Sequence, residues 1–383
     1  MLAPNELTRD PRARRAAAAA VAAGHEVVGV CGSSPGETPV MLKGVEIVRV
    51  RSGRVSARLR QAGFGGARRS SALVRELRGL FRIGRLLAAN LSLAGAARRV
   101  GAADVVHAHD FDALPAGWAV ARRIGARLVY DAHEIYADQE PGAPRIYRGL
   151  VRVLEGRLAR SADAVLTVSE PIAAELRRTL RLRKPPIVVL SCPPLTEVDP
   201  APVGEGPLRA IYQGAMGPGR PLEDLLVAAA RAPEVELTLR IAGADLDALR
   251  EAASALPNVQ VAEPVAPDRL VEALAGFHVG LVINRPLTRN DELVFPNKLF
   301  EYLMAGLAVL VPRLPGLAPL VEEEQIGLTY EPGRPEDLGD ALTRLARDPA
   351  RLEELRGRAR RLAVERFNTE AQRAALETGW RPA

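Results

Sequence analysis

A glycine-rich segment in the second half of the chain has the composition of an anion-binding loop. It reads Tyr212-Gln213-Gly214-Ala215-Met216-Gly217-Pro218-Gly219-Arg220. Glycines such as Gly214 let a backbone approach an anion closely, and the following helix N-terminus and Arg220 supply positive potential. The segment therefore predicts a phosphate or diphosphate site, although a surface turn with a solvated arginine has the same composition. Its G-x-x-G-x-G spacing weakens a dinucleotide interpretation.

A second segment, Phe295–Val309, predicts a short helix followed by a buried strand. Pro296 suits the first turn of that helix, and Gly306 suits its end. Glu301 then lies on a helix at the ligand-binding edge of a sheet, where a carboxylate can accept hydrogen bonds from both hydroxyls of a ribose. The alternative is an exposed glutamate on a helix surface.

Histidines at predicted strand ends form a third candidate site. His107 and His109 end one strand and His133 follows the next, so all three are expected at one edge of a parallel sheet. Asp131 alternates onto the same face as His133 and could orient its imidazole. For His107, a core histidine satisfied by the backbone is favoured.

The acidic residues after His109 allow two further interpretations. A metal site from His107, His109 and Asp110 lacks other ligands at a diagnostic spacing, so we predict no metal and no other cofactor. Asp110-Phe111-Asp112 has a D-x-D pattern that can also bind metal. A capping role for the helix that begins near Ala113 is favoured instead, because aspartate is common at that position.

Short β-rich runs alternate with longer helical patterns, which predicts an α/β fold of doubly wound parallel sheets with helices on both faces. The predicted strands are His25–Cys31, Val45–Val50, Asp104–His107, Arg127–Tyr130, Ala164–Val168, Ile187–Leu190, Leu208–Gln213, Glu236–Ala242, Val259–Val261, Val279–Ile283 and Ala308–Val311. Asp10 and Pro11 form a good N-cap pair for the first helix. A doubly wound domain should open with a strand, and only Met1–Pro4 are available for one before this helix. A truncated first strand is therefore expected.

A proline-rich stretch without apolar periodicity predicts an interdomain linker at residues 194–206. We therefore expect an N-terminal domain at residues 1–193 and a C-terminal domain at residues 207–365. A C-terminal helix at residues 366–383 is expected to pack back across the domains. Open α/β sheets bind ligands beyond the carboxyl ends of their strands, so the site is expected in a cleft between the two domains.

Composition restricts the class of protein. The 383 residues are 48% hydrophobic and 26% charged, which excludes a disordered chain. Only Cys31 and Cys192 are available for a bridge, so a disulfide framework is excluded and a cytoplasmic location is expected. No targeting segment is convincing, and no run of about 20 apolar residues predicts a spanning helix.

Positive charge is concentrated in residues 51–100, which contain 12 arginines and one acid, Glu76. The predicted helix Ser71–Arg99 has an apolar stripe, as interfacial helices do; it consists of Val74, Leu77, Phe81 and Leu86. The segment predicts contact with an anionic membrane surface, and an ordinary helix with its arginines in water is the alternative. Nucleic-acid binding is not expected, because stacking partners are few and no known module is present.

Taken together, these motifs resemble those of the family 4 glycosyltransferases of the GT-B fold, over nearly the whole chain. The segments that carry the resemblance are Asp10-Pro11-Arg12, Gly24–Val27, Asp104–Asp110, Tyr130–Glu134, Ala162–Ser169, Tyr212–Arg220 and Pro296–Gly306. The resemblance implies two Rossmann-like domains that face a cleft. It also implies transfer of a sugar from a nucleotide-activated donor with retention of anomeric configuration and without an essential metal.

The resemblance also implies roles for individual residues. Glu301 matches the second glutamate of the family's E-x7-E signature, which holds the nucleotide ribose. Arg220 matches the basic residue of the family's G-R-L-x-x-x-K-G loop, which contacts the diphosphate. His133 matches the strand-end histidine near the donor sugar, and Asp131 is its expected orienter.

Three positions depart from the family pattern. Leu293 stands where the first signature glutamate is expected, with Asp291 and Glu292 close by but out of register. Ala215 replaces the arginine of the G-R-L triplet, so one diphosphate cation is missing. Its expected substitutes are the Lys298 side chain or the backbone amides of Pro296, Asn297, Lys298 and Leu299. The glycine-rich loop expected after the first strand is absent from Met1–Arg9, which implies a clipped start.

We therefore expect a retaining glycosyltransferase that uses a nucleotide-diphosphate sugar, UDP-linked rather than GDP-linked. The expected acceptor is lipid-linked or a glycan in cell-envelope polysaccharide or glycolipid synthesis, at the inner face of the cell membrane. His133, Asp131 and Arg220 are the predicted catalytic residues. The alternatives are a nucleotide-sugar epimerase of similar fold and a non-catalytic binding protein that has kept the fold.

Overall fold

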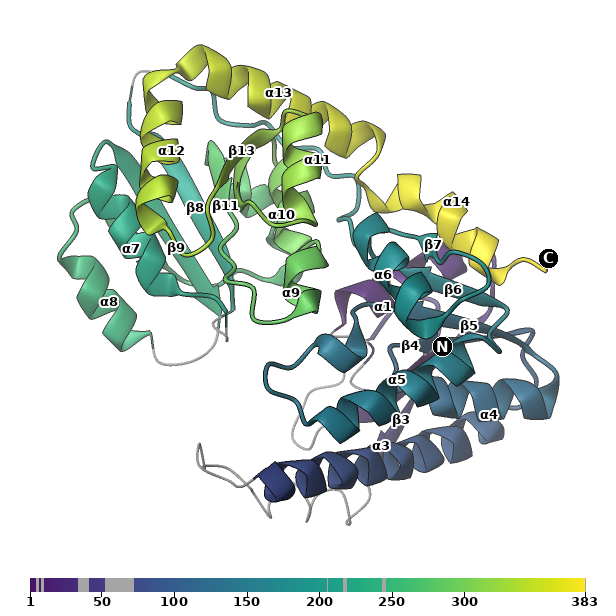
Figure 1. Cartoon of the computed structure of the whole chain (residues 1–383). Helices are drawn as coiled ribbons and strands as arrows, with labels where there is room; N and C mark the ends of the chain where they lie inside the picture. The colour runs from purple at the N-terminus through teal and green to yellow at the C-terminus, as the bar shows by residue number, and fades with distance from the viewer. Residues whose placement is uncertain are drawn as a thin grey trace. The chain divides into compact units, whose positions relative to one another are not determined.

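The chain forms two compact units in the computed structural model, Met1–Val189 together with Arg373–Ala383, and Leu190–Gln372 (Figure 1). The structure describes residues 1–4, 7, 10–33, 41–51, 72–204, 206–215, 219–242 and 246–382. Within the predicted linker, residues 194–204 form neither helix nor strand. Most of the arginines in the first part of the predicted basic segment and residues 216–218 of the glycine-rich loop lie outside the described residues.

The first unit is built on a parallel sheet with the strand order β3-β2-β1-β4-β5-β6-β7. Its strands are β1 (Leu2–Ala3), β2 (Val27–Ser33), β3 (Val45–Arg51), β4 (Val105–His109), β5 (Arg127–Ala132), β6 (Ala164–Thr167) and β7 (Ile187–Val188). The two-residue β1 lies in the middle of this sheet, paired with β2 and β4. The amino group of Met1 donates a hydrogen bond to the carbonyl of Val28 over 2.8 Å.

Helices connect the strands of this sheet along the chain and pack against it. They are α1 (Pro11–Ala22), α3 (Ala72–Val100), α4 (Leu114–Ile124), the 3-10 turn η1 (Tyr136–Asp138), α5 (Arg145–Ala159) and α6 (Glu170–Leu180). The predicted start of α1 is confirmed, because the Asp10 side chain accepts hydrogen bonds from the N–H groups of Arg12 and Ala13. The alanines of α1 are largely buried, and their small side chains let this helix lie close to the sheet.

The last helix, α14 (Thr369–Trp380), supplies part of the first unit's core. Leu376 and Trp380 are buried with Val129 and Leu166 of the sheet. Gly379 lies against Leu166, where an added Cβ would come within 3.0 Å of its side chain. The carbonyl of Gly379 accepts a hydrogen bond from the Arg127 guanidinium over 3.0 Å. The first unit is therefore completed by residues that follow the whole of the second unit in sequence.

The second unit has a parallel sheet with the strand order β10-β9-β8-β11-β12-β13. Its strands are β8 (Leu208–Ala215), β9 (Val235–Ala242), β10 (Val259–Ala262), β11 (Val279–Leu281), β12 (Ala308–Pro312) and β13 (Gly327–Tyr330). The predicted α/β class with parallel sheets is confirmed. The edge strand β13 is not among the predicted strands, because its four residues carry too short a pattern to be read as a strand.

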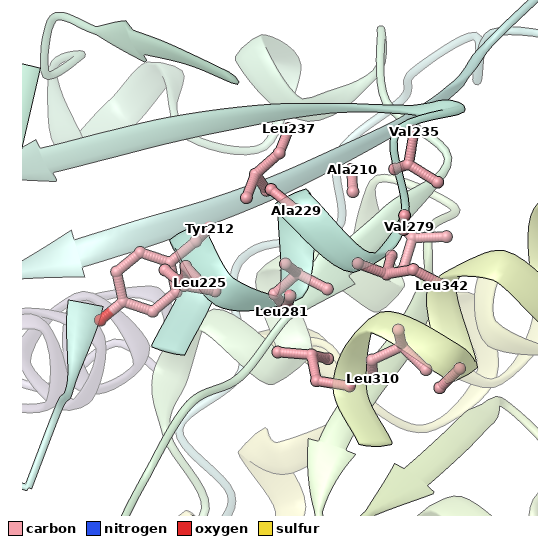
Figure 2. Close-up of a cluster of buried hydrophobic side chains, with 14 of the residues drawn as sticks. Ala210, Tyr212, Leu225, Ala229, Val235, Leu237, Val279, Leu281, Leu310 and Leu342 are labelled. Atoms are coloured by element: carbon pink, nitrogen blue, oxygen red, sulfur yellow. The ribbon is translucent and has the colours of Figure 1, made fainter. Parts of the chain in front are cut away.

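The helices of the second unit are α7 (Leu222–Arg231), α8 (Asp247–Ser254), η2 (Pro267–Arg269), η3 (Glu272–Leu274), α9 (Arg289–Leu293), α10 (Asn297–Met304), α11 (Leu317–Glu323), α12 (Pro335–Arg347) and α13 (Pro349–Glu365). One core cluster joins α7 and α12 to the central strands. Figure 2 shows Leu225 of α7 and Leu342 of α12 packed with Tyr212 of β8 and Leu281 of β11. This core fixes the carboxyl end of β8, where the glycine-rich loop begins.

None of the helices in the described part of the chain combines the length and the apolar character that crossing a bilayer requires.

Candidate functional site

The glycine-rich loop leaves β8 through a fixed backbone. The N–H of Gln213 donates to the hydroxyl of Tyr302 over 3.0 Å, and that hydroxyl donates to the carbonyl of Leu281 over 3.2 Å. Gly214 has a φ of +155°, and a Cβ added there would lie 2.6 Å from the Nζ of Lys298. Gly214 therefore gives the lysine its room, which is one physical reason for a glycine at this position.

Arg220 is exposed where the loop reaches α7, and its Nη1 donates to the carbonyl of Ala215 over 3.2 Å. The positive charge of Arg220 affects two nearby groups. It helps to lower the pKa of Lys298, and it opposes the rise in the pKa of Tyr212 that burial causes. The structure thus brings the predicted Arg220, Gly214 and Lys298 together at the carboxyl end of β8.

Lys298 is partly buried on the first turn of α10, with its Nζ 4.0 Å from the centre of the Tyr212 ring. It forms no ion pair with any residue that the structure describes. Burial, reinforced by the nearby charge of Arg220 and only partly offset by Glu301, lowers the pKa of Lys298 to about 7. Lys298 is therefore a second basic group beside Arg220, in a place where its positive charge is poorly compensated until an anion binds.

Backbone amides at the start of α10 are available at fewer positions than the sequence predicted. Pro296 is the N-cap of α10 and has no N–H to offer, and the N–H of Leu299 already donates to the Pro296 carbonyl over 3.0 Å. The side chain of Leu299 is fully buried in the core. The expected contributions of Pro296 and Leu299 as donors are therefore wrong, and the N–H groups of Asn297 and Lys298 remain for an anion.

Glu301 lies one turn further along α10 and is 8% exposed, so the alternative of an exposed surface glutamate is excluded. Its Oε2 accepts a hydrogen bond from Nε2 of Gln213 over 2.8 Å. The Oε1 of Gln213 in turn faces Nη1 of Arg240 at 3.4 Å. Gln213 therefore positions the carboxylate, a role that the sequence did not indicate because a glutamine inside a strand has no distinctive spacing.

The carboxylates near the missing first signature glutamate serve the fold. Leu293 is 3% exposed at the end of α9. The Oδ2 of Asp291 accepts hydrogen bonds from the N–H groups of Leu287 and Thr288 in a capping box. Glu292 pairs with Arg289 over 2.6 Å. Asp291 is therefore occupied by local structure, and Leu293 offers no polar group.

In the first unit, a buried ion pair underlies the histidines. The Nε and Nη2 atoms of Arg12 donate to the two carboxylate oxygens of Asp131 over 3.0 and 2.9 Å, and Arg12 Nη1 also bonds to the Val189 carbonyl. Burial alone would raise the pKa of Asp131, but the Arg12 guanidinium and the nearby His107 and His133 outweigh it and hold this pKa well below its usual range. Asp131 is therefore ionised and fully buried.

His133 follows β5 directly and has a different principal partner from the predicted one. Its Nδ1 lies 3.1 Å from Oδ2 of Asp110, whereas its Nε2 lies 3.7 Å from Oδ2 of Asp131. The Oδ1 of Asp110 also accepts the backbone N–H of His133 over 3.0 Å, and Asp110 adopts a φ of +60°. The prediction that Asp131 is the main orienter is corrected, because Asp110 makes the shorter contact and Asp131 is engaged by Arg12.

The protonation of the histidines follows from these contacts. Burial would lower the pKa of His133, but Asp110, with help from Asp131, raises it well above its usual value. Burial and the neighbouring His107 lower the pKa of His109 well below its usual value. His133 is thus an imidazolium, and its Nε2–H can donate to Nδ1 of the neutral His109 over 3.3 Å.

His107 is a buried core histidine, as predicted, but its partner is a side chain and not the backbone. The indole N–H of Trp380 donates to Nδ1 of His107 over 3.2 Å, and His107 Nε2 faces Asp131 at 3.5 Å.

Asp112 does not cap α4 as predicted. Its Oδ1 instead accepts a hydrogen bond from the Tyr136 hydroxyl. The N-cap residue of α4 is Ala113, and no side chain accepts a capping hydrogen bond there.

His107, His109 and Asp131 bring possible metal-binding atoms within 4.8 Å of one another. Both oxygens of Asp131 are already bound by the Arg12 guanidinium, however. That fixed positive charge disfavours a cation at the same carboxylate, so this cluster fits a metal poorly. The expectation that the reaction needs no metal stays a prediction.

Comparison with known proteins agrees with this architecture of two parallel-sheet units. Residues 10–193 match the model of a glycosyl transferase 4-like domain, and residues 220–377 match that of a glycosyl transferase-like domain. No curated protein sequence matches the chain. The fold and the two domain matches define a GT-B glycosyltransferase. The chain belongs to the family 4 glycosyltransferases and is an enzyme of sugar transfer.

Solved structures support the same fold. Sucrose-phosphate synthase from Thermosynechococcus elongatus is similar over 99% of this chain and 97% of its own, with a TM-score of 0.74 and 19% identity. HepE from Anabaena, in complex with UDP-glucose, matches 98% of this chain and 97% of its own, with a TM-score of 0.67 and 14% identity. Trehalose 6-phosphate synthase from Burkholderia multivorans has a TM-score of 0.68 and 14% identity over 99% of this chain and 97% of its own.

Proposed function

We propose that this glycosyltransferase transfers a sugar from a UDP-sugar to a lipid-linked or glycan acceptor, with retention of anomeric configuration. The observation that carries the proposal is the grouping of Arg220, Lys298 and Glu301 around the carboxyl end of β8. Two cations and one carboxylate match the charges and hydroxyls of a nucleoside diphosphate. HepE, a structural neighbour, was solved with UDP and with UDP-glucose, which favours uridine as the base.

The diphosphate is assigned to Arg220, Lys298 and the N–H groups of Asn297 and Lys298. Two positive side chains replace the pair of cations that the family loop supplies, with Lys298 in place of the residue lost at Ala215. When the bond between sugar and diphosphate breaks, negative charge builds up on the leaving phosphate oxygens. Fixed positive groups at those oxygens stabilise this charge without reorganisation, which is where the enzyme lowers the barrier.

The ribose is assigned to Glu301. A carboxylate is an acceptor with two oxygens, so it can receive hydrogen bonds from two neighbouring hydroxyls. Gln213 holds Oε2 of Glu301 over 2.8 Å, which limits rotation of the carboxylate before the nucleotide binds. The pre-ordered geometry reduces the conformational entropy that binding must otherwise remove.

His133 is assigned to the sugar end of the donor, as the family resemblance implies. Both of its ring N–H groups already face partners, Asp110 and His109, and its high pKa leaves it protonated. We therefore infer that it contributes positive charge, and that it does not act as a general base. Asp131 is assigned a positioning role, since it holds Arg12 and borders all three histidines.

The acceptor is proposed to be lipid-linked or a glycan of cell-envelope polysaccharide or glycolipid synthesis, reached at the inner face of the cell membrane. The basic and apolar composition of α3 motivates this choice. Sucrose-phosphate synthase and trehalose 6-phosphate synthase have the same fold, which makes a sugar phosphate the natural competitor in an acceptor screen.

Two measurements test the proposal. Thermal unfolding in UDP, GDP and ADP is expected to show the largest stabilisation with UDP, because a selective ligand stabilises the native state by mass action. UDP release from UDP-sugars is then measured with and without lipid-linked, glycan and sugar-phosphate acceptors. Glu301→Gln is expected to lose UDP stabilisation, and Glu292→Gln, a matched change at an exposed pair, is expected to keep it.

Release of UDP that depends on a lipid-linked or glycan acceptor supports the proposal, and the anomeric configuration of the product tests retention. Isomerisation of the donor without any acceptor contradicts sugar transfer and indicates an epimerase. Equal stabilisation of wild type and Glu301→Gln by UDP removes Glu301 from the ribose site.

A further inference from the structure

The helix α3 exposes a continuous apolar stripe to solvent. Its large apolar side chains are between 38% exposed, at Val74, and 76% exposed, at Leu91. The others in the stripe are Leu77, Leu80, Phe81 and Leu87. Spacings of three and four residues place them on one side of the helix, whereas buried residues such as Leu93 and Ala97 lie on the other. An ordinary helix that covers a sheet exposes polar residues on its outer side, so this stripe needs a different explanation.

The neighbouring helix α5 continues the apolar surface. Ile146, Leu150 and Val153 are each about half exposed and lie on one side of α5, which packs against α3. Between the two helices lies a cavity of about 240 Å³; it is lined mostly by apolar side chains of both helices, and also by Phe111 and Arg157. In Figure 1 the two helices run along the same side of the first unit. Together, the exposed apolar residues of the two helices and the recess between the helices are called the strip.

Positive charge surrounds this strip. The segments α3 and α5 contain ten arginines and two glutamates. Both glutamates serve the fold, since Glu76 accepts the N–H groups of Arg145 and Ile146 over 3.0 Å, and the buried Glu155 accepts the Tyr130 hydroxyl over 2.7 Å.

Six of these arginines are exposed and form no ion pair with any described residue; they are Arg75, Arg85, Arg98, Arg99, Arg145 and Arg157. The cationic surplus of the strip is therefore available to a partner. That partner must be anionic and must also accept apolar side chains.

This combination selects among the possible occupants. A symmetric second copy would place the same arginine-rich strip against itself, which brings like charges together. An anionic bilayer offers negative headgroups at the level of the arginines and an acyl boundary for the apolar side chains.

We propose that α3 and α5 form a docking surface for an anionic lipid bilayer, with their recess receiving part of an acyl chain. The proposal deepens the acceptor class given above and rests on the proposed function only for its link to catalysis. The apolar stripe enters the boundary between headgroups and acyl chains, and the arginines contact the headgroups. A lipid-linked acceptor would then reach the enzyme by diffusion within the bilayer.

Sedimentation with vesicles tests this surface, using phosphatidylcholine alone and phosphatidylcholine with 30% phosphatidylglycerol. Wild type is expected to bind the anionic vesicles at least tenfold more tightly than the neutral ones, and to be released by high salt. Leu77→Gln with Phe81→Gln is expected to weaken binding about tenfold or more. Arg75→Gln with Arg85→Gln is expected to weaken it about fivefold for each arginine removed.

Matched controls change equally exposed residues elsewhere. Val227→Gln with Leu287→Gln alters apolar residues of the second unit, and Arg123→Gln with Arg183→Gln removes arginines outside the strip. Both pairs are expected to bind vesicles as wild type does. Unchanged melting temperatures and unchanged UDP binding in every variant show that the fold and the nucleotide site are intact.

Three results overturn the proposal: no preference for anionic vesicles, strip variants that bind as tightly as the controls, or a concentration-dependent dimer that the Leu77→Gln, Phe81→Gln variant abolishes. The last result assigns the strip to a second copy. Failure of UDP to bind any of the proteins contradicts the proposed function instead, and leaves the vesicle result to be judged by itself.

Discussion

Raising the pH from 7.5 to 9 is expected to weaken UDP binding, because Lys298 loses its proton over that range. In the free protein, burial and Arg220 lower the pKa of Lys298 to about 7. A bound diphosphate brings negative charge to the same place and restores a higher pKa. Binding of UDP therefore takes up a proton, and the affinity for UDP must fall as the pH rises above the pKa of Lys298 in the free protein.

The size of the effect follows from that pKa. With a free-state pKa of about 7, Lys298 is roughly 24% protonated at pH 7.5 and roughly 1% protonated at pH 9. The dissociation constant for UDP is then expected to rise about 25-fold between these values, when the complex stays protonated. Below pH 7 the lysine is already mostly charged, so its contribution levels off. At pH 8, binding should take up about 0.9 proton.

Isothermal titration of UDP in buffers with different ionisation enthalpies measures both the affinity and the proton uptake. The range above pH 7.5 avoids the last ionisation of the diphosphate, near pH 6. Lys298→Arg keeps a cation that stays charged throughout, so it is expected to bind UDP with an affinity that varies little with pH. Lys184→Arg, at an exposed site, is the matched control and should keep the wild-type profile.

The reasoning fails if wild type and Lys298→Arg show the same pH profile, or if the heat of binding does not depend on the buffer. Either result means that another group titrates, or that the lysine stays charged in the free protein. The buried Glu155 of the first unit also has a pKa of about 7, raised by burial, so it would titrate over the same pH range. The Lys298→Arg variant separates the two groups, because it removes only the titration of Lys298.

Three further changes probe other parts of the enzyme. Arg220→Ala is expected to slow turnover about 100-fold or more without changing the melting temperature, since it removes fixed charge from the leaving group; steady-state kinetics and thermal unfolding measure both. Asp110→Asn is expected to lower the pKa of His133 toward its usual value, which NMR titration of the imidazole detects. Trp380→Ala is expected to reduce the free energy of unfolding by about 3–5 kcal/mol, measured by denaturant titration.

Each of these changes has its own control. Arg269→Ala removes an exposed arginine of the same unit and should leave turnover as it is. Asp104→Asn changes an exposed aspartate away from the histidines and should not shift the His133 titration. Trp380→Phe keeps most of the buried ring but loses the N–H that bonds to His107, so its cost should be clearly smaller than that of Trp380→Ala. Turnover of Arg220→Ala equal to wild type removes that residue from the site.

Much of the architecture could be predicted because it depends on local patterns. Alternating β-rich runs and helices, Asp10 with Pro11 at the start of α1, and Gly306 after α10 are each set by neighbours in sequence. The sequence pattern predicted β1 only as a truncated first strand and did not predict β13. These strands are two and four residues long. Such short strands are held by their partners in the sheet, and their own residues carry little pattern.

The partners of the polar residues were harder to predict, because they come from distant parts of the chain. Asp131 lies two positions from His133, yet its ion pair is with Arg12 on α1. Asp110 reaches His133 because its backbone adopts a φ of +60°, which no spacing rule indicates. His107 meets Trp380, 273 residues away in sequence. Residue types identified the candidates, and only the fold decides which carboxylate serves which histidine.

The placement of α14 affects the order in which this protein can be made. Leu376 and Trp380 complete the core of the first unit, so a ribosome releases most of that unit long before the residues that close it. Until then, the Nδ1 of His107 lacks its indole donor and Leu166 is left uncovered. The second unit, whose residues are contiguous, can finish folding on the nascent chain while the first is still open.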